Sequence, residues 1–251
     1  GRPCTIHLKL DTGMHRLGFE DDELAGLEAG LRENPNIRVG SLFTHLSGAD
    51  EKVHDAFSAE QARLFTSMAD RLQKVLGYKP LRHMLNSSGI LRFPQFQMDM
   101  VRLGIGLYGI DPTDEGNAHL RPVVTLRTII SQIKKVRAGD TVGYGRRGKI
   151  SKDSVTATLA IGYADGFSRK FSNGAGNVLI NGKLAPVKGN VCMDMTMVDI
   201  TGITAKEGDE AIIFGPGLPI QQVAQWIETI PYEILTSTSD RVKRVFYAES
   251  I

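Results

Sequence analysis

Four stretches of the chain place polar or basic residues just after a short apolar run. They are Lys9 with Arg16, His45, Asn86-Ser87-Ser88, and Arg102 with Gly104 and Ile105. Catalytic and binding groups in parallel α/β folds lie where strands end and loops begin, so we expect these residues to converge. Ser87 opens a predicted helix and Gly104 permits close backbone approach, which together suit a phosphate group.

Each of these residues also has an ordinary structural interpretation. Ser87 alone is consistent with a helix N-cap, and His45 alone with a structural histidine. Lys9 or Arg16 alone is consistent with a solvated surface charge. The convergence of several such residues favours a binding site more than any one of them does.

A second cluster covers residues 161–167 and places Tyr163 between Gly162 and Gly166. A tyrosine held exposed at a strand end, with a lowered pKa, can act as a general base. The alternative interpretation is a hairpin whose tyrosine packs on the core.

A third cluster covers residues 189–194 and contains Cys192 and Asp194. These types could indicate a nucleophile or a ligand. No second cysteine and no suitable histidine spacing accompany them, so we predict no metal site. A tight turn that enters a strand is the favoured interpretation.

Strands and helices alternate over the first 110 residues, and this alternation predicts a parallel α/β domain. The predicted strands are Ile6 to Leu10, Ile37 to Leu46, Arg82 to Leu85 and Met98 to Leu103. Helical spacing of apolar residues predicts helices over 24–31 and 57–75, the second ended by Gly77, and a short one from Ser87. Four βα units make a partial (β/α)8 barrel, whose other half would lie upstream, or an open doubly wound sheet.

After a polar linker at residues 111–117 the pattern changes to short strands. The predicted strands are Val123 to Val136, Asp140 to Tyr144, Val155 to Ile161, Val178 to Ile180, Ala185 to Lys188 and Met195 to Ile200. Asn181-Gly182 is a strong hairpin signal, and one helix is predicted near residues 220–227. We therefore predict two domains, residues 1–118 and a mostly β domain at 119–251.

Composition excludes several classes of protein. The 251 residues carry 30 Lys+Arg and 28 Asp+Glu, a net charge of +2, so no nucleic-acid partner is implied. The chain contains two cysteines and no apolar run of roughly 18 residues, which favours a reducing cytoplasm and no membrane partner. It begins Gly1-Arg2-Pro3, without methionine, so we expect a piece of a longer protein.

The motifs together resemble alanine racemase. They are Ile6 to Gly18, Thr44-His45, Asn86 to Gly89, Met100 to Ile105, Gly162 to Phe167 and Cys192 to Asp194, in that family's order. The resemblance implies a pyridoxal 5'-phosphate (PLP) enzyme that interconverts L- and D-alanine for peptidoglycan synthesis. It also implies a barrel domain followed by a β domain, and a homodimer with a shared active site. The chain is similar, too, to the racemase half of fusions with a cell-wall peptide ligase.

The resemblance assigns cofactor roles in the first domain. Ser87, Gly104 and Ile105 match phosphate-binding positions, and Arg102 matches an arginine that donates to the pyridine nitrogen. An arginine stays charged in proteins, so it cannot readily protonate that nitrogen. Lys9 matches a lysine that is often carbamylated in the family.

The resemblance also assigns roles near the substrate. Tyr163, from the partner subunit, matches the base that removes the α-proton of L-alanine. His45 matches a histidine expected to link Tyr163 and Arg102. Arg16 and the backbone at Met193 match groups that contact the substrate carboxylate.

Two departures from the family pattern stand out. No lysine lies in a motif like Val-Lys-Ala-Asn-Ala-Tyr-Gly, which carries the Schiff-base lysine in the family. We therefore expect the C-terminal two thirds of a racemase, inactive as isolated. Asp240 aligns where some members have a phosphate-contacting tyrosine, so that contact is expected to be lost or replaced.

Four alternatives stay open at this point. A PLP-dependent decarboxylase of related fold usually carries a His-x-Gly-Ser-Gly loop, which the chain lacks. A serine or broad-specificity racemase is not distinguished by these residues. A non-catalytic dimerisation or PLP-binding fragment, and a cofactor-free phosphate-binding protein, are the remaining two.

Overall fold

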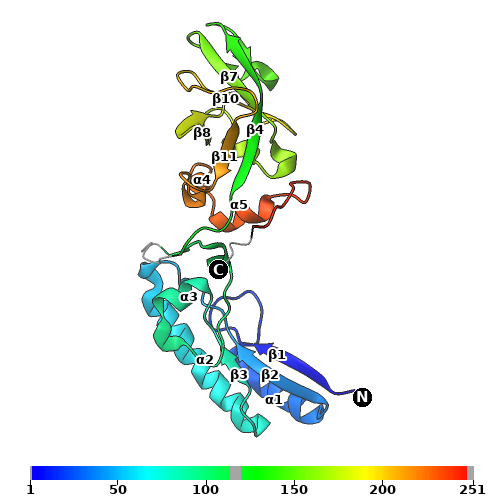
Figure 1. Cartoon of the computed structure of the whole chain (residues 1–251). Coiled ribbons are helices and arrows are strands. Elements are labelled where there is room, and N and C mark those ends of the chain that lie inside the picture. The colour runs from blue at the N-terminus through cyan, green and yellow to red at the C-terminus, as the bar shows by residue number, and fades with distance from the viewer. Residues whose placement is uncertain (1, 114–119, 248–251) are drawn as a thin grey trace. The chain divides into compact units, whose positions relative to one another are not determined.

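A computed structural model describes residues 2–113 and 120–247. The chain divides into two units, Gly1–Val123 and Val124–Ile251, which are described separately below (Figure 1). The predicted boundary between residues 118 and 119 falls outside the described residues.

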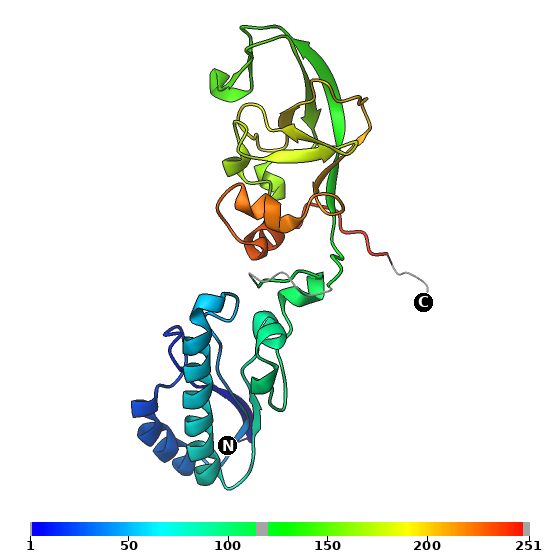
Figure 2. The ribbon, with the colours of Figure 1, turned by 90° about the vertical axis from the view of Figure 1, so that its left-hand side faces the viewer.

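The first unit contains a parallel sheet with the order β1-β2-β3. Its strands are β1 (Cys4–Lys9), β2 (Ile37–Phe43) and β3 (Leu81–His83). Its helices are α1 (Leu24–Glu33), α2 (Asp55–Leu76) and α3 (Ser87–Arg92), with 3-10 turns at Asp21–Glu23, Lys52–His54, Pro94–Phe96 and Ile105–Tyr108. Figure 2 shows α1 and α2 side by side along the sheet.

The long helix α2 supplies much of the core of this unit. Phe65, Met68 and Leu72 recur at helical spacing and are fully buried. They belong to one apolar cluster with strand residues such as Val39. The helix ends as predicted at Gly77, whose φ of +72° suits a residue without Cβ.

The predicted fourth strand, Met98 to Leu103, is wrong, because the structure has no strand there. Two backbone hydrogen bonds still tie the segment to the chain around β3: Asp99 N–H donates to Arg82 C=O and Arg102 N–H to Leu85 C=O. The Asp99 carboxylate accepts the N–H of Arg82 at 2.9 Å, so a side chain takes the place of a backbone carbonyl. The described part of this unit therefore has three strands rather than four.

The second unit is built on a six-stranded antiparallel sheet with the order β10-β7-β4-β11-β8-β9. Its strands are β4 (Leu126–Val136), β7 (Ser154–Leu159), β8 (Asn177–Ile180), β9 (Lys183–Pro186), β10 (Thr196–Asp199) and β11 (Glu210–Phe214), with a separate hairpin of β5 (Thr141–Val142) and β6 (Gly148–Lys149). A bridge between Val187 and Val198 joins the two outer strands, so the sheet curves back on itself. The Asn181-Gly182 hairpin is confirmed, with φ of +48° and +76°.

Two strands and one α-helix of this unit were not predicted: β6, β11 and α5 (Pro231–Ser237). The apolar run of β11, Ile212 to Phe214, is too short to identify a strand by periodicity. The predicted helix near residues 220–227 is α4 (Ile220–Gln225). Tyr144 lies in a 3-10 turn rather than in a strand.

Candidate active site

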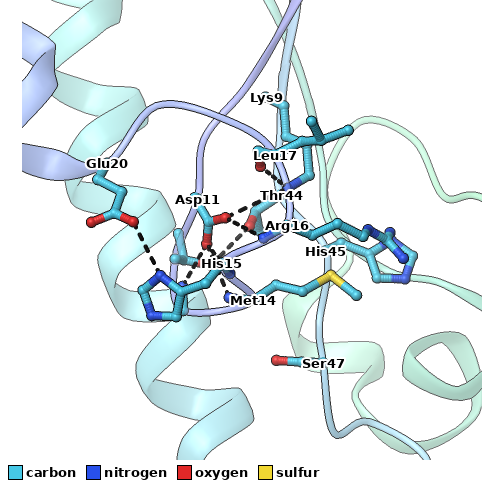
Figure 3. A network of polar contacts seen from close by, with 12 residues as sticks. Lys9, Asp11, Met14, His15, Arg16, Leu17, Glu20, Thr44, His45 and Ser47 are labelled. Atoms are coloured by element: carbon cyan, nitrogen blue, oxygen red, sulfur yellow. Dashed lines mark hydrogen bonds and ion pairs between the residues drawn. The ribbon is translucent and has the colours of Figure 1, made fainter.

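A single carboxylate shapes the loop that follows β1. Asp11 Oδ1 accepts the N–H groups of Gly13, Met14 and His15 at 2.9, 2.9 and 3.0 Å, and Oδ2 accepts that of Arg16 at 3.2 Å (Figure 3). Burial raises the pKa of Asp11, but these donors outweigh it and hold the pKa below its ordinary value. The loop that carries Arg16 is therefore fixed by a buried anion.

Lys9 lies at the end of β1, beside this carboxylate. Its Nζ donates to the Leu17 carbonyl and is 4.0 Å from Asp11 Oδ2. Burial lowers the pKa of Lys9; Asp11 opposes that shift, and the nearby cations Arg16 and Arg102 add to it. The amine thus has a larger neutral fraction than a surface lysine has.

Arg102 is the centre of the polar network at the strand ends. Its Nη1 donates to His83 Nδ1 at 2.7 Å, and its Nη2 to the carbonyls of Thr44 (2.8 Å) and Met84 (3.1 Å) and to His45 Nδ1 (3.1 Å). A guanidinium is donor only, so each imidazole accepts at Nδ1 and carries its hydrogen on Nε2. These contacts occupy both terminal nitrogens, and among the contacts of the described residues Nε–H is left as the donor for a ligand.

Both histidines in contact with Arg102 are neutral at neutral pH. Burial, followed by the charge of Arg102, lowers the pKa of His45 to about 4 and that of His83 to about 4. In Figure 3 the side chain of Arg16 extends toward His45, and its charge also lowers the pKa of His45. The imidazoles therefore offer lone pairs to the cation rather than competing with it.

His83 continues the network across the sheet. Its Nε2–H donates to Ser41 Oγ at 3.1 Å, which leaves the Ser41 hydroxyl to donate to His7 Nδ1 at 2.7 Å. Its ring also stacks on Phe43 with 5.0 Å between centroids. Sequence reasoning missed His83, although its place as the last residue of β3 was a usable signal.

Ser87 lies where a phosphate-binding serine was predicted. Its Oγ is buried and accepts the N–H groups of Gly104 (3.0 Å) and Gly106 (3.2 Å). A Cβ added to Gly104 would meet only Ser87 Oγ within 4 Å, at 3.7 Å, so that side of the backbone is open. The N-cap of α3 is Asn86, not Ser87. Because Ser87 Oγ is the acceptor in both of its bonds, its hydroxyl hydrogen is available to a ligand.

In the second unit, Tyr163 opens a 3-10 turn directly after β7. Its N–H donates to the Cys192 carbonyl and the Ala164 N–H to the Met193 carbonyl, both at 3.0 Å. Any Cβ on Gly162 would lie 2.3 Å from those two oxygens. Tyr163 is 44% exposed, so the alternative of a tyrosine packed on the core is wrong.

An ion-pair bridge links the same two loops. Arg241 Nε lies 2.9 Å from Asp165 Oδ1, and its Nη2 lies 2.6 Å from Asp194 Oδ1. The Asp165 carboxylate is mostly buried, whereas Arg241 and Asp194 are half-exposed. Tyr163 and Met193 are thus held together within this unit, on adjoining loops.

The structure places the sequence-predicted residues in two groups. Seven lie at or near the strand ends of the first unit: Lys9, Arg16, His45, Ser87, Arg102, Gly104 and Ile105.

Within residues 2–113 and 120–247, no three His, Cys, Asp or Glu side chains are grouped so as to hold a metal ion. No helix in these ranges is long and apolar enough to cross a membrane.

Comparison with known proteins matches both units. Residues 1–112 match the N-terminal domain of alanine racemase and residues 123–246 its C-terminal domain. The alanine racemase of Desulforamulus reducens is 41% identical over 98% of the chain and 68% of its own length.

Solved structures give the same match. The alanine racemase of D-cycloserine-producing Streptomyces lavendulae has a TM-score of 0.91 and 34% identity, over 99% of this chain and 68% of that one. That of Bartonella henselae, with covalently bound pyridoxal phosphate, has a TM-score of 0.86 and 33% identity, over 97% of this chain and 66% of that one.

The chain spans about two thirds of the length of these relatives. The match over both units excludes the decarboxylase and the cofactor-free phosphate-binding protein as alternatives. The order of motifs, the strand-end network around Arg102 and the similarity across both units lead to one conclusion: the chain belongs to the alanine racemase family.

Proposed function

We propose that the protein carrying this chain interconverts L- and D-alanine with PLP as its cofactor. The observation that carries the proposal is Arg102, a cation fixed between two neutral histidines with its Nε–H free for a ligand. Family membership supplies the substrate class, because the similar proteins are alanine racemases.

The strand ends fit the cofactor. Ser87 can donate its hydroxyl to a phosphate, and the open side of Gly104 next to the buried Ile105 leaves room for it. Bound PLP withdraws electrons from the α-carbon of an amino acid and so acidifies its α-proton. Arg102 would donate a hydrogen bond to the pyridine nitrogen while keeping its own proton, which limits this withdrawal and favours proton exchange over side reactions.

Tyr163 is the proposed base on the L-alanine side. Its turn holds the phenol exposed, and in the proposed homodimer it would come from the partner subunit. His45 carries its hydrogen on Nε2, so it can donate to that phenolate and favour the charged form. The N–H of Met193 and the side chain of Arg16 would hold the substrate carboxylate.

Lys9 is the proposed site of carbamylation. A neutral Nζ can attack carbon dioxide, forming an N–C bond and releasing one proton, and the lowered pKa of Lys9 favours that form. The resulting anion would replace a cation beside Arg16 and orient it by a charge-assisted hydrogen bond. Asp240, whose side chain is exposed and paired with Arg244 at 3.3 Å, would not replace a phosphate-contacting tyrosine.

The second base is proposed to lie outside this chain. No lysine of the chain stands in the family's PLP-lysine motif, so the three-stranded sheet would belong to a partial barrel and the chain alone would be inactive. A cytoplasmic location rests on the two cysteines, which are both free, and stays a prediction.

Borohydride reduction of this chain with PLP, followed by intact-mass measurement, tests the lysine assignment. We expect no covalent adduct. One stoichiometric adduct would mean that a lysine of this chain holds the cofactor. Production of D-alanine from L-alanine by the protein that carries the chain tests the activity itself, and conversion of serine at an equal rate would replace alanine with a broader substrate class.

A further inference from the structure

Gln61 is a wholly buried amide on α2 whose hydrogen bonds, within the described residues, all go to the loops that follow the strands. Its Nε2 donates to Thr12 Oγ1 at 3.3 Å and to the His45 carbonyl at 3.2 Å. Its Oε1 accepts the Ser47 N–H at 3.0 Å and the Ser47 hydroxyl at 3.1 Å. Two donor hydrogens and two lone pairs are thus all used, which is the full capacity of a primary amide.

These hydrogen bonds connect Gln61, directly or through one further hydrogen bond, to two residues that accept from Arg102. Thr12 Oγ1 lies 2.7 Å from Thr44 Oγ1. Thr44 and His45 both accept from Arg102 Nη2, the first through its carbonyl and the second through Nδ1. Gln61 therefore contacts His45 directly and Thr44 through Thr12, and both of these residues accept from the guanidinium.

We propose that Gln61 is a positioning residue that sets the orientation of His45, and through it of Arg102, for the racemase reaction. The proposal rests on the proposed function for its catalytic meaning. An apolar side chain of the same length would fill the core equally well, so packing does not account for the amide. A purely structural tie between α2 and the sheet is the competing interpretation.

The charge state of His45 reports on this orientation. Three charges act on its ring, those of Arg102, Arg16 and Lys9 in its unmodified, protonated form. Together with burial they lower the pKa of His45 to about 4 from 6.5. A His45 backbone released from Gln61 would let the ring tilt toward water and away from Arg102, and its pKa would rise.

The test compares Gln61→Met with Gln73→Met in the full chain. Gln73 is on the same helix, but its side-chain oxygen accepts from the Arg82 guanidinium at 2.7 Å rather than bonding the loops that carry Thr12 and His45. Imidazole 15N chemical shifts of His45 at pH 6, assigned with His45→Gln, are the readout. We expect His45 to be neutral in the parent and in Gln73→Met, and partly protonated in Gln61→Met.

An unchanged His45 titration in a folded Gln61→Met chain would overturn the proposal, even if its thermal stability fell. If that variant does not fold, Gln61→Asn replaces it, because its shorter, uncharged amide cannot reach Thr12, the His45 carbonyl and Ser47 at once. We expect the same rise in the pKa of His45, and no change overturns the proposal. None of these readouts uses PLP or racemisation, so failure of the proposed function would leave their outcome intact.

Holoenzyme kinetics add a second readout. In the protein that carries the chain, Gln61→Met should lower kcat for alanine racemisation by about tenfold or more, with KM little changed, because a positioning defect acts on the reacting geometry. Gln73→Met should match the parent. An equal loss in both variants would indicate a structural tie and overturn the positioning role.

Discussion

The two units hold their candidate catalytic groups by opposite means. At the strand ends of the first unit, polar side chains supply much of the support: the Asp11 carboxylate orders the backbone of the Arg16 loop. The imidazoles of His83 and His45 hold Arg102 together with backbone carbonyls. In the second unit, Tyr163 is fixed through its backbone, by carbonyls of the facing loop. The first arrangement buries charge and shifts pKa values, whereas the second leaves a phenol exposed on a rigid turn.

This difference follows from the chemistry each group would perform. A cation that must donate to a cofactor in one direction benefits from a preorganised set of hydrogen bonds that fixes its orientation. A base that must reach a substrate benefits from an exposed side chain on a rigid support. The first site should therefore be sensitive to changes in side-chain polarity, and the second to changes in backbone shape.

Loss of the phenol itself should have the largest effect. Tyr163→Phe in the protein that carries the chain keeps the turn but removes the proposed base, so solvent exchange of the α-proton should fall by about 100-fold or more for L-alanine and much less for D-alanine. Deuterium incorporation followed by NMR for each enantiomer measures this. Equal losses for both would argue against a base that acts on one face only.

The turn that holds the Tyr163 phenol should be nearly as sensitive to substitution as the phenol itself. Gly162→Ala places a Cβ 2.3 Å from two backbone oxygens, so the turn must shift, and a displacement of about 1 Å costs about 100-fold in rate. Racemase activity of the carrying protein is the measurement. Gly26→Ala on α1 is the control, since its Cβ meets nothing within 4 Å, and an active Gly162→Ala would show that the turn tolerates the shift.

The sequence predicted the candidate catalytic residues of both units better than it predicted the residues that hold them in place. Ser87, Arg102 and Tyr163 were identifiable because they are polar residues in motifs of one family, although the strand predicted to carry Arg102 did not form. Gln61 left no such signal, because it lies mid-helix and reaches its partners only once α2 packs on the sheet. β11 was missed for a related reason, because its partners are distant in sequence.

Substitution of Asp11 should have an intermediate effect, and it tests how the first unit holds the loop that carries Arg16. Asp11→Asn turns one acceptor into a donor facing the buried N–H groups, so the free energy of unfolding should fall by about 2 kcal/mol. The folded pKa of Asp11 lies below its ordinary value of 3.8, so its contribution is present above pH 3.8 and is lost as pH falls through the folded pKa.

Urea unfolding at pH 6 and at pH 3 measures the effect of Asp11→Asn. The difference from the parent should be larger at pH 6, where the parent carboxylate is charged in both the folded and the unfolded states. Asp22→Asn is the matched control, an exposed residue in the 3-10 turn that follows the loop. A difference that grew toward low pH would contradict the assignment of Asp11 as the anion that orders the loop.

Substitution of Arg241 should have the smallest effect. It tests most directly whether backbone hydrogen bonds, rather than side chains, hold the loops of the second unit. Its bridge from Asp165 to Asp194 is the side-chain link between the Tyr163 and Met193 loops, but it is half-exposed. If backbone bonds fix these loops, Arg241→Gln should lower racemase activity by less than about fivefold, and 0.5 M salt should reduce the difference further, because exposed ion pairs are weak and screened. A loss as large as that of Gly162→Ala would mean that side chains fix the catalytic geometry in the second unit too, and the contrast between the two units would fail.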